Sequence, residues 1–125
     1  MDRAGIPHLT VTELAKLIET KQVSPVEAVE AYLDRIEQVN PVVNAYVTVC
    51  AEEARRDARQ AEEEIQQGHY RGPLHGVPVA IKDQIHTKGI RTTDGSKLRA
   101  TFVPEEDATV MANLKIGRAS CRERV

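Results

Sequence analysis

The sequence has few of the residues that mark specialised classes of protein. It has no tryptophan, three tyrosines and one phenylalanine, so it lacks the aromatic platforms on which proteins stack single-stranded nucleic acid. Seventeen Lys and Arg stand against 19 Asp and Glu, a formal net charge of -2. This balance lacks the basic excess that indicates nucleic-acid binding. We therefore expect a small molecule or a protein as partner, without direct nucleic-acid binding.

Cysteine and long apolar segments are also scarce. Cys50 and Cys121 are the only cysteines, too few for the disulfide framework of a small secreted protein. No apolar run approaches the roughly 20 residues that span a bilayer, and residues 1–10 lack an apolar core of signal-peptide length. These absences predict a soluble, cytoplasmic protein that does not bind a membrane.

Two helix-start motifs lie in the first third of the sequence. Thr10-x-x-Glu13 and Ser24-Pro25-x-Glu27 have the spacing in which side chains satisfy the free amides at a helix N-terminus. Apolar residues then recur at intervals of three and four. This pattern predicts a short helix over 10–20 and a second helix that begins at Pro25 and stops at Asn40-Pro41.

Residues 44–67 predict a short strand followed by a surface helix. Alternating apolar and polar residues over 44–50 favour the strand, and a helix start is the alternative. The apolar positions of the following helix share one face: Ala54, Ala58, Ala61 and Ile65. The other positions are mostly charged or amide residues, which is typical of a solvated face, and Gly68 is the expected stop.

The sequence becomes apolar over 74–81, which predicts a strand. One face would carry Val77, Val79 and Ile81, and the other Pro78, Ala80 and Lys82. Residues 87–96 predict a closely packed loop in which Gly89 and Gly95 are turn glycines. Asp107 is a candidate N-cap for a final helix.

Lys82 is the candidate catalytic residue, and its position at the end of an apolar strand has two interpretations. In the first, its aliphatic stem covers apolar surface while the ammonium reaches water. In the second, the amine is held out of bulk water, where the charged form of a lysine is disfavoured. A neutral amine can accept a proton from a hydroxyl group, which would make Lys82 a general base.

A resemblance to a known family favours the second interpretation. The segment from Gly76 to Asp83, Gly-Val-Pro-Val-Ala-Ile-Lys-Asp, is followed by Thr87-x-Gly89 and Thr92-Thr93-x-Gly95-Ser96. Together these resemble the opening motif of the amidase signature family. The resemblance extends over nearly all of residues 10–115, including Ser24-Pro25-x-Glu27, Asn40-Pro41-x-x-Asn44-Ala45 and Asp107-Ala108-Thr109.

The resemblance implies a fold and a mechanism. The fold is α/β, the N-terminal part of an amidase signature fold in which helices cover a mixed β-sheet. The activity is hydrolysis of carbon–nitrogen bonds in small-molecule carboxamides, without a cofactor or a metal. The lysine that matches Lys82 is the base of a Ser, cis-Ser, Lys triad, in which an acyl-enzyme forms on the nucleophilic serine.

The two triad serines are expected downstream, in a Gly/Ser-rich stretch that does not occur here. Ser24 is explained as a helix cap, and Ser120 lies in the C-terminal tail discussed below. Ser96 remains as the internal alternative, because a Ser96–Lys82 dyad would be a hydrolase built within this chain. We expect instead that the fragment is inactive. Asp94 differs from the small residue common at its position, and the sequence leaves its role open.

A metal site built from His75, His86 and Asp83 is a weaker alternative. The three residues lack the spacing of a metal-ligand motif. Each histidine is more simply interpreted as a surface or packing residue.

The last ten residues differ in character from the rest. From Ile116 to Val125 the apolar periodicity ends, and the sequence resembles an in-frame translation of a widely used sequencing-library adapter. We therefore predict that residues 1–115 are the N-terminal fragment of an amidase domain and that residues 116–125 are a non-native tail. A genuine basic tail is the alternative.

Three functions remain open from the sequence. The first is an amidase that acts on a primary carboxamide. The second is the glutaminase subunit of a tRNA-dependent aspartyl/glutamyl-tRNA amidotransferase, which has the same triad and would bring the other amidotransferase subunits as partners. The segments 89–97 and 102–109 resemble that subunit. The third is a non-catalytic, truncated module.

Overall fold

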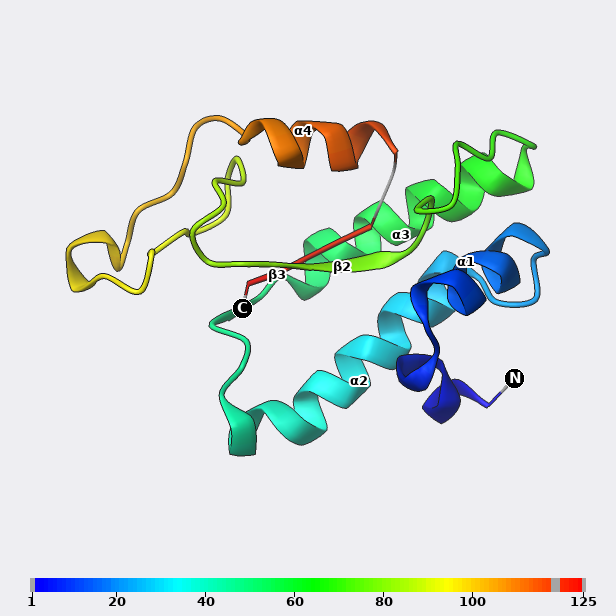
Figure 1. The fold of residues 1–125 in the computed structure, drawn as a ribbon, viewed down its shortest axis with the longest axis horizontal. Helices are drawn as coiled ribbons and strands as arrows, with labels where there is room; N and C mark the ends of the chain where they lie inside the picture. Colours follow the sequence, from blue (N-terminus) through cyan, green and yellow to red (C-terminus); the bar gives the residue numbers. More distant parts are fainter. Residues whose placement is uncertain (1, 118–119, 125) are drawn as a thin grey trace.

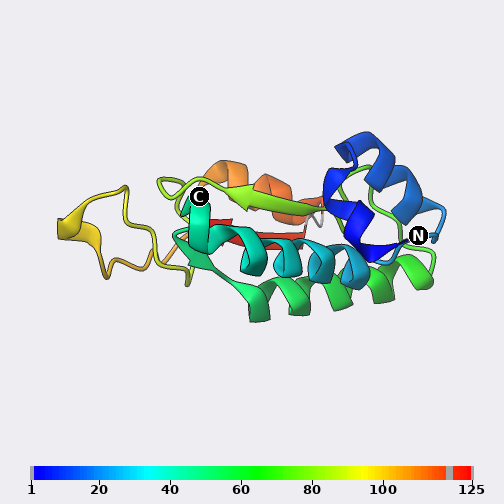
Figure 2. The ribbon, with the colours of Figure 1, turned by 90° about the horizontal axis from the view of Figure 1, so that it is seen from below.

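The described residues, 2–117 and 120–124 of a computed structural model, form helices around a small sheet. The elements are η1 (Arg3–His8, a 3-10 helix), α1 (Val11–Glu19), α2 (Pro25–Val43), β1 (Thr48–Val49), α3 (Ala51–Gln66), β2 (Pro78–Ile81), η2 (Lys97–Arg99), α4 (Thr109–Ile116) and β3 (Ser120–Arg124). Figure 1 shows β2 and β3 between α4 on one side and α2 on the other. Figure 2 shows α2 and α3 packed side by side.

Within the described residues, the sheet has three strands in the order β1-β3-β2. β3 pairs antiparallel with β1 and parallel with β2, so the sheet is mixed. Helices α2 and α3 both contact this sheet. The α/β fold with a mixed, helix-covered sheet that the sequence predicts is therefore confirmed.

The central strand β3 belongs to residues 116–125, which the sequence separates as a non-native tail. Strand pairing uses backbone N–H and C=O groups, which almost every residue carries. The pairing of β3 therefore does not reveal where these residues come from, and their origin stays a prediction.

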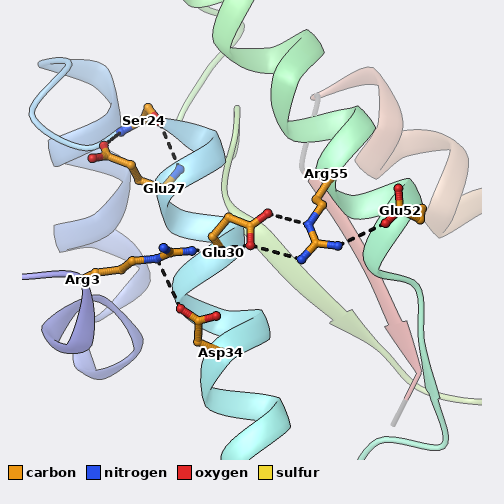
Figure 3. A network of polar contacts seen from close by, with 7 residues as sticks. All are labelled: Arg3, Ser24, Glu27, Glu30, Asp34, Glu52 and Arg55. Carbon is orange, nitrogen blue, oxygen red and sulfur yellow. Dashed lines mark hydrogen bonds and ion pairs between the residues drawn. The ribbon is translucent and has the colours of Figure 1, made fainter.

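Both predicted helix starts form complete capping boxes. The Thr10 hydroxyl accepts from the Glu13 amide at 3.2 Å, and the Glu13 carboxylate accepts from the Thr10 amide at 2.8 Å. The Ser24 hydroxyl accepts from the Glu27 amide at 3.1 Å, and the Glu27 carboxylate accepts in return at 2.8 Å, as drawn in Figure 3. The start of each helix is therefore encoded within four residues.

The predicted end of the second helix is wrong. α2 continues through Pro41 to Val43 and ends where Asn44 adopts a left-handed conformation, with φ of 49°. Proline removes one amide donor, yet here it lies in the last turn. The side chain of Asn40 also bonds both main-chain groups of Tyr46, at 2.8 and 3.1 Å, which ties the end of the helix to the following segment.

The buried face and the end of α3 are as the sequence predicts. Ala54, Ala58, Ala61 and Ile65 are all buried, and Gly68 has φ of +85° just after the helix. Ala54 and Ala58 form an apolar cluster with Val29 and Leu33 of α2. The strand before α3 is shorter than predicted, because β1 is limited to residues 48–49.

The strand predicted over 74–81 is also shorter. β2 begins at Pro78, because residues 72–77 form turns in which the His75 amide donates to the Gly72 carbonyl and the Val77 amide to the Leu74 carbonyl. Gly76 has φ of +83°, and a Cβ atom there would lie 2.6 Å from Pro25 Cγ. This segment therefore packs directly against the first turn of α2.

Asp107 is not the N-cap of the last helix, contrary to the sequence prediction. The cap of α4 is Ala108, and no side chain accepts a bond there. Asp107 lies one residue too early. Its carboxylate instead accepts from the Lys88 amide at 2.7 Å and pairs with the Lys115 ammonium, which fastens α4 to the loop after β2.

A polar network centred on Glu30 joins three helices (Figure 3). The Glu30 carboxylate accepts two bonds from the Arg55 guanidinium of α3, at 2.5 and 3.2 Å, and one from Arg3 of η1 at 3.4 Å. Arg55 also donates to Glu52 at 3.1 Å. The hydrogen bonds from Arg55 lower the pKa of Glu30 against the opposing effect of burial. The same pairing raises the pKa of Arg55.

Candidate functional site

Lys82 is the first residue after β2. The alternation predicted from the sequence holds at this end of the strand, because Ile81 is buried whereas Ala80 and Lys82 are exposed. Lys82 enters no ion pair of the described residues. Its amine is therefore available on the exposed face of the strand.

The chain turns immediately after Lys82, and a buried carboxylate holds the turn. The Ile85 amide donates to the Lys82 carbonyl at 3.0 Å. Asp83 is 8% exposed. One carboxylate oxygen of Asp83 accepts from the Thr93 amide at 3.0 Å, and the other accepts from the Thr93 hydroxyl.

The loop that returns to Asp83 is itself sharply bent. Asp94 and Gly95 both have positive φ, 52° and 66°, and the Asp94 amide donates to the Asp83 carbonyl at 2.8 Å. The Thr93 hydroxyl accepts from the Gly95 amide at 3.2 Å. The carboxylate of Asp94 pairs with Arg99 at 2.8 Å, so Asp94 shapes and braces the loop.

Ser96 has a structural partner of its own. Its hydroxyl accepts from the Leu98 amide at 3.2 Å and caps η2. Its amide donates to the Thr93 carbonyl at 2.8 Å. Among the described residues, no hydrogen bond joins Ser96 to Lys82, so the dyad alternative gains no support from the geometry.

The two histidines and Asp83 have separate partners. His75 is completely buried; its Nδ1 accepts from the Arg71 amide at 3.0 Å and its Nε2 lies 3.2 Å from Glu64. The ring of His86 lies 5.4 Å from that of Phe102. Across the part of the chain that the structure describes, no three His, Cys, Asp or Glu side chains form a metal-binding group.

Two hollows in the surface lie away from Lys82. One, of about 430 Å³, lies between η1 and α2, and the other, of about 520 Å³, is lined by α1 and Tyr70. Lys82 lines neither of them.

Among the described residues, no helix is long and apolar enough to cross a membrane.

The sequence singles out Lys82 but misses the role of its neighbours. It offers Asp83 as a metal ligand, whereas the structure shows Asp83 bonded to Thr93. One feature of the sequence could have indicated this contact: Asp83 and Thr93 belong to the same motif, and the glycines in that motif allow the chain to turn back tightly. Glu30 and Glu64 have no such signal, because they lie within charged helix faces.

Comparison with known proteins identifies the family. The family model for amidases matches residues 27–118, a range that includes Lys82 and the whole Asp83–Thr93 turn. A bacterial aryl acylamidase of the amidase signature family shares the fold with a TM-score of 0.83 and 32% sequence identity, over 93% of this chain and 24% of that one. The chain belongs to the amidase signature family.

Two sequence relatives are subunits A of glutamyl-tRNA(Gln) amidotransferase. The subunit from Carboxydothermus hydrogenoformans is 47% identical over 108 residues, which is 86% of this chain and 22% of the relative. The subunit from Geobacter sp. strain M21 is 50% identical over 107 residues, again 22% of its length. The chain therefore spans less than a quarter of these relatives.

Proposed function

We propose that residues 1–115 are the N-terminal part of an amide hydrolase in which Lys82 is the general base. The observation that carries the proposal is the position of Lys82 at the end of β2, on the exposed face and beside a braced turn. This position lies within the segment that matches the amidase family.

The proposed chemistry is proton transfer followed by acyl transfer. Neutral Lys82 takes the proton of a serine hydroxyl through a second serine, and the serine oxygen bonds to the carboxamide carbon. The carbon–nitrogen bond then breaks, and nitrogen leaves with the proton. Water hydrolyses the acyl-enzyme and releases the acid. Both serines belong to the part of the enzyme that follows residue 115.

The exposure of Lys82 supports the proposal that this fragment supplies the lysine and the rest of the enzyme supplies the serines. A lysine that works as a neutral base must be shielded from bulk water, because solvation favours its charged form. In the described residues Lys82 is exposed, so the shielding walls would come from the rest of the enzyme. Residues 1–125 alone are therefore expected to be inactive. Turnover of a simple carboxamide by the purified chain, abolished by Ser96→Ala, would contradict this and support the dyad.

The decisive test is Lys82→Arg in the complete enzyme, compared with Lys82→Ala. Arginine keeps the charge and much of the stem but stays protonated, so it cannot accept the serine proton. We expect both variants to lose roughly 100 to 10,000-fold in kcat, the usual value of general-base catalysis, with unchanged melting. Near-normal turnover by Lys82→Arg would return Lys82 to a structural role.

A second candidate, the glutaminase subunit of a tRNA-dependent amidotransferase, is favoured by one observation. Identity to the two amidotransferase subunits is 47 and 50%, against 40% over 119 residues to a putative amidase from Mycobacterium bovis. Its substrate would be the primary carboxamide of glutamine, and its partners the other amidotransferase subunits in the cytoplasm. ATP-dependent amidation of misacylated tRNA by the reconstituted enzyme would support this candidate; hydrolysis of carboxamides without any such reaction would support the simple amidase.

A self-sufficient, non-catalytic module is the remaining alternative, and its stability tests it. Val47, Val49, Leu74, Phe102 and Val110 are large apolar residues exposed at 38 to 52%, which suggests surfaces that the rest of an enzyme covers. We therefore expect residues 1–115 to show no cooperative thermal transition. A sharp transition would favour the independent module.

A further inference from the structure

The most constrained polar group near Lys82 is the carboxylate of Asp83. It is buried, and both oxygens accept from a single residue ten positions away, Thr93. The carbonyl of Asp83 also accepts from the Asp94 amide at 2.8 Å. Three hydrogen bonds therefore fix the residue that follows the proposed base.

We propose that Asp83 and Thr93 form a clamp that positions Lys82 for proton transfer. This inference rests on the proposed function of Lys82 as a general base. Neither Asp83 nor Thr93 touches substrate in the proposal. They act through the backbone, by fixing the point at which the chain leaves β2.

The geometry explains why a clamp is needed at this point. The β2 strand ends at Ile81, so Lys82 lies beyond its last residue, and its carbonyl accepts instead from the Ile85 amide at 3.0 Å within the turn. Without the two bonds from Thr93, the turn would be held by its own short-range bond and by the single bond from the Asp94 amide to the Asp83 carbonyl. A displacement of about 1 Å at a reacting group can cost on the order of 100-fold in rate. The clamp therefore fixes the position of Lys82, on which the rate of proton transfer depends.

The clamp also keeps the Asp83 carboxylate from pairing directly with the ammonium of Lys82. A free carboxylate next to Lys82 could pair with the ammonium and favour the protonated form, which cannot act as a base. Here the two Asp83 oxygens are engaged by the amide and the hydroxyl of Thr93. The carboxylate is thereby directed towards the loop.

The adjacent threonine provides a matched control. Thr92 is also buried, and its hydroxyl donates to the Ile90 carbonyl at 3.1 Å, within the same loop. Thr92→Val and Thr93→Val therefore remove the same group from neighbouring buried positions. Of the two, it is Thr93 that bonds the residue after Lys82.

The test is steady-state kinetics of these variants in the complete enzyme, with Lys82→Arg measured alongside. We expect Thr93→Val to lower kcat on the order of 10 to 100-fold with KM unchanged, while Thr92→Val keeps kcat near the wild-type value. Thr93→Ser restores the hydroxyl and should recover most of the rate. Should Thr93→Val fail to fold, Asp83→Glu, which moves the carboxylate by one methylene, should show the same loss in kcat.

The outcomes separate the clamp from the function on which it rests. An inactive Lys82→Arg together with equal kcat for Thr92→Val and Thr93→Val would overturn the clamp and leave the base in place. A loss confined to KM, or no recovery in Thr93→Ser, would also overturn it. An active Lys82→Arg would overturn the proposed function, and the clamp with it.

Discussion

The helical region, residues 10–66, and the loop region, residues 83–107, are held together by different kinds of contact. α1 and α2 begin at capping boxes formed within four residues, whereas α3 begins after Cys50 without a side-chain cap. α2 packs on α3 through an apolar cluster. The loop region is fixed by polar bonds between distant residues, such as Lys88 to Asp107 at 2.7 Å and Arg91 to Thr48 at 3.4 Å. Regular structure in this chain comes from local pattern, and the geometry beside Lys82 comes from long-range polar contacts.

The largest effect on stability is expected at Gly76, where the helical region meets the segment before β2. In Gly76→Ala, the new Cβ would lie 2.6 Å from Pro25 Cγ. Overpacking costs about 1 to 3 kcal/mol, and the positive φ adds about 1 kcal/mol. Denaturant unfolding of the complete enzyme measures the sum.

Gly89→Ala separates the cost of overpacking from the cost of the positive φ. Gly89 has φ of +76°, and a Cβ atom at this position would have no neighbour within 4 Å. We expect only the conformational cost of about 1 kcal/mol. Equal destabilisation at both glycines would show that the contact with Pro25 contributes nothing.

A smaller effect is expected when a helix start is broken. Ser24→Ala removes the hydroxyl that accepts from the Glu27 amide, and loss of such a cap costs about 1 kcal/mol. Ser24→Thr keeps an acceptor and should retain most of the stability. If Ser24→Ala unfolds at the wild-type denaturant concentration, the local signal does not stabilise α2.

The smallest effect concerns the network between helices. Glu30→Gln should cost about 0.5 to 1 kcal/mol, because the Glu30–Arg55 pair is partly solvated and such pairs contribute little. Glu52→Gln is the control, since it loses one bond to the same Arg55 from a side chain that is 85% exposed. We expect no measurable change in the free energy of unfolding of Glu52→Gln. Comparable losses in both variants would contradict a specific contribution of the Glu30–Arg55 pair.

The pH dependence of the same pair has a definite sign. The pKa of Glu30 is lowered in the folded state, chiefly by its bonds from Arg55. Its contribution is therefore complete above the unfolded glutamate pKa and is lost as pH falls through the lower folded pKa. The stability difference between wild type and Glu30→Gln should shrink over that acid range; a difference that persists unchanged would argue against the ion pair.

The sequence predicts the parts of this fold that are set by neighbouring residues. The predictions for Thr10, Ser24, Gly68 and the alanine face of α3 are all confirmed, because capping and helical periodicity act over a few positions. The prediction at Pro41 is wrong, because the amide missing at Pro41 leaves only the carbonyl of Glu37 without its helical donor, and Glu37 is exposed to water.

The candidate site is predicted less completely, for a physical reason. Lys82 can be found from its motif, and its assignment as the base stays a prediction. The sequence suggests a local role for Asp107 as a helix cap, whereas its partners Lys88 and Lys115 lie 19 and 8 residues away. Asp83 likewise bonds Thr93 across ten residues. Such pairs have no fixed spacing, so a single sequence does not reveal them.

The close approach of Gly76 to Pro25 affects which of the two positions can change during evolution. A side chain at 76 is opposed both by the left-handed backbone and by the proline ring, whereas position 25 is constrained only by its neighbours and its place in the helix. Evolution should therefore be able to replace Pro25 while Gly76 remains. Among family members, we expect the glycine to persist across wide sequence distances and the residue facing it to vary mainly in size.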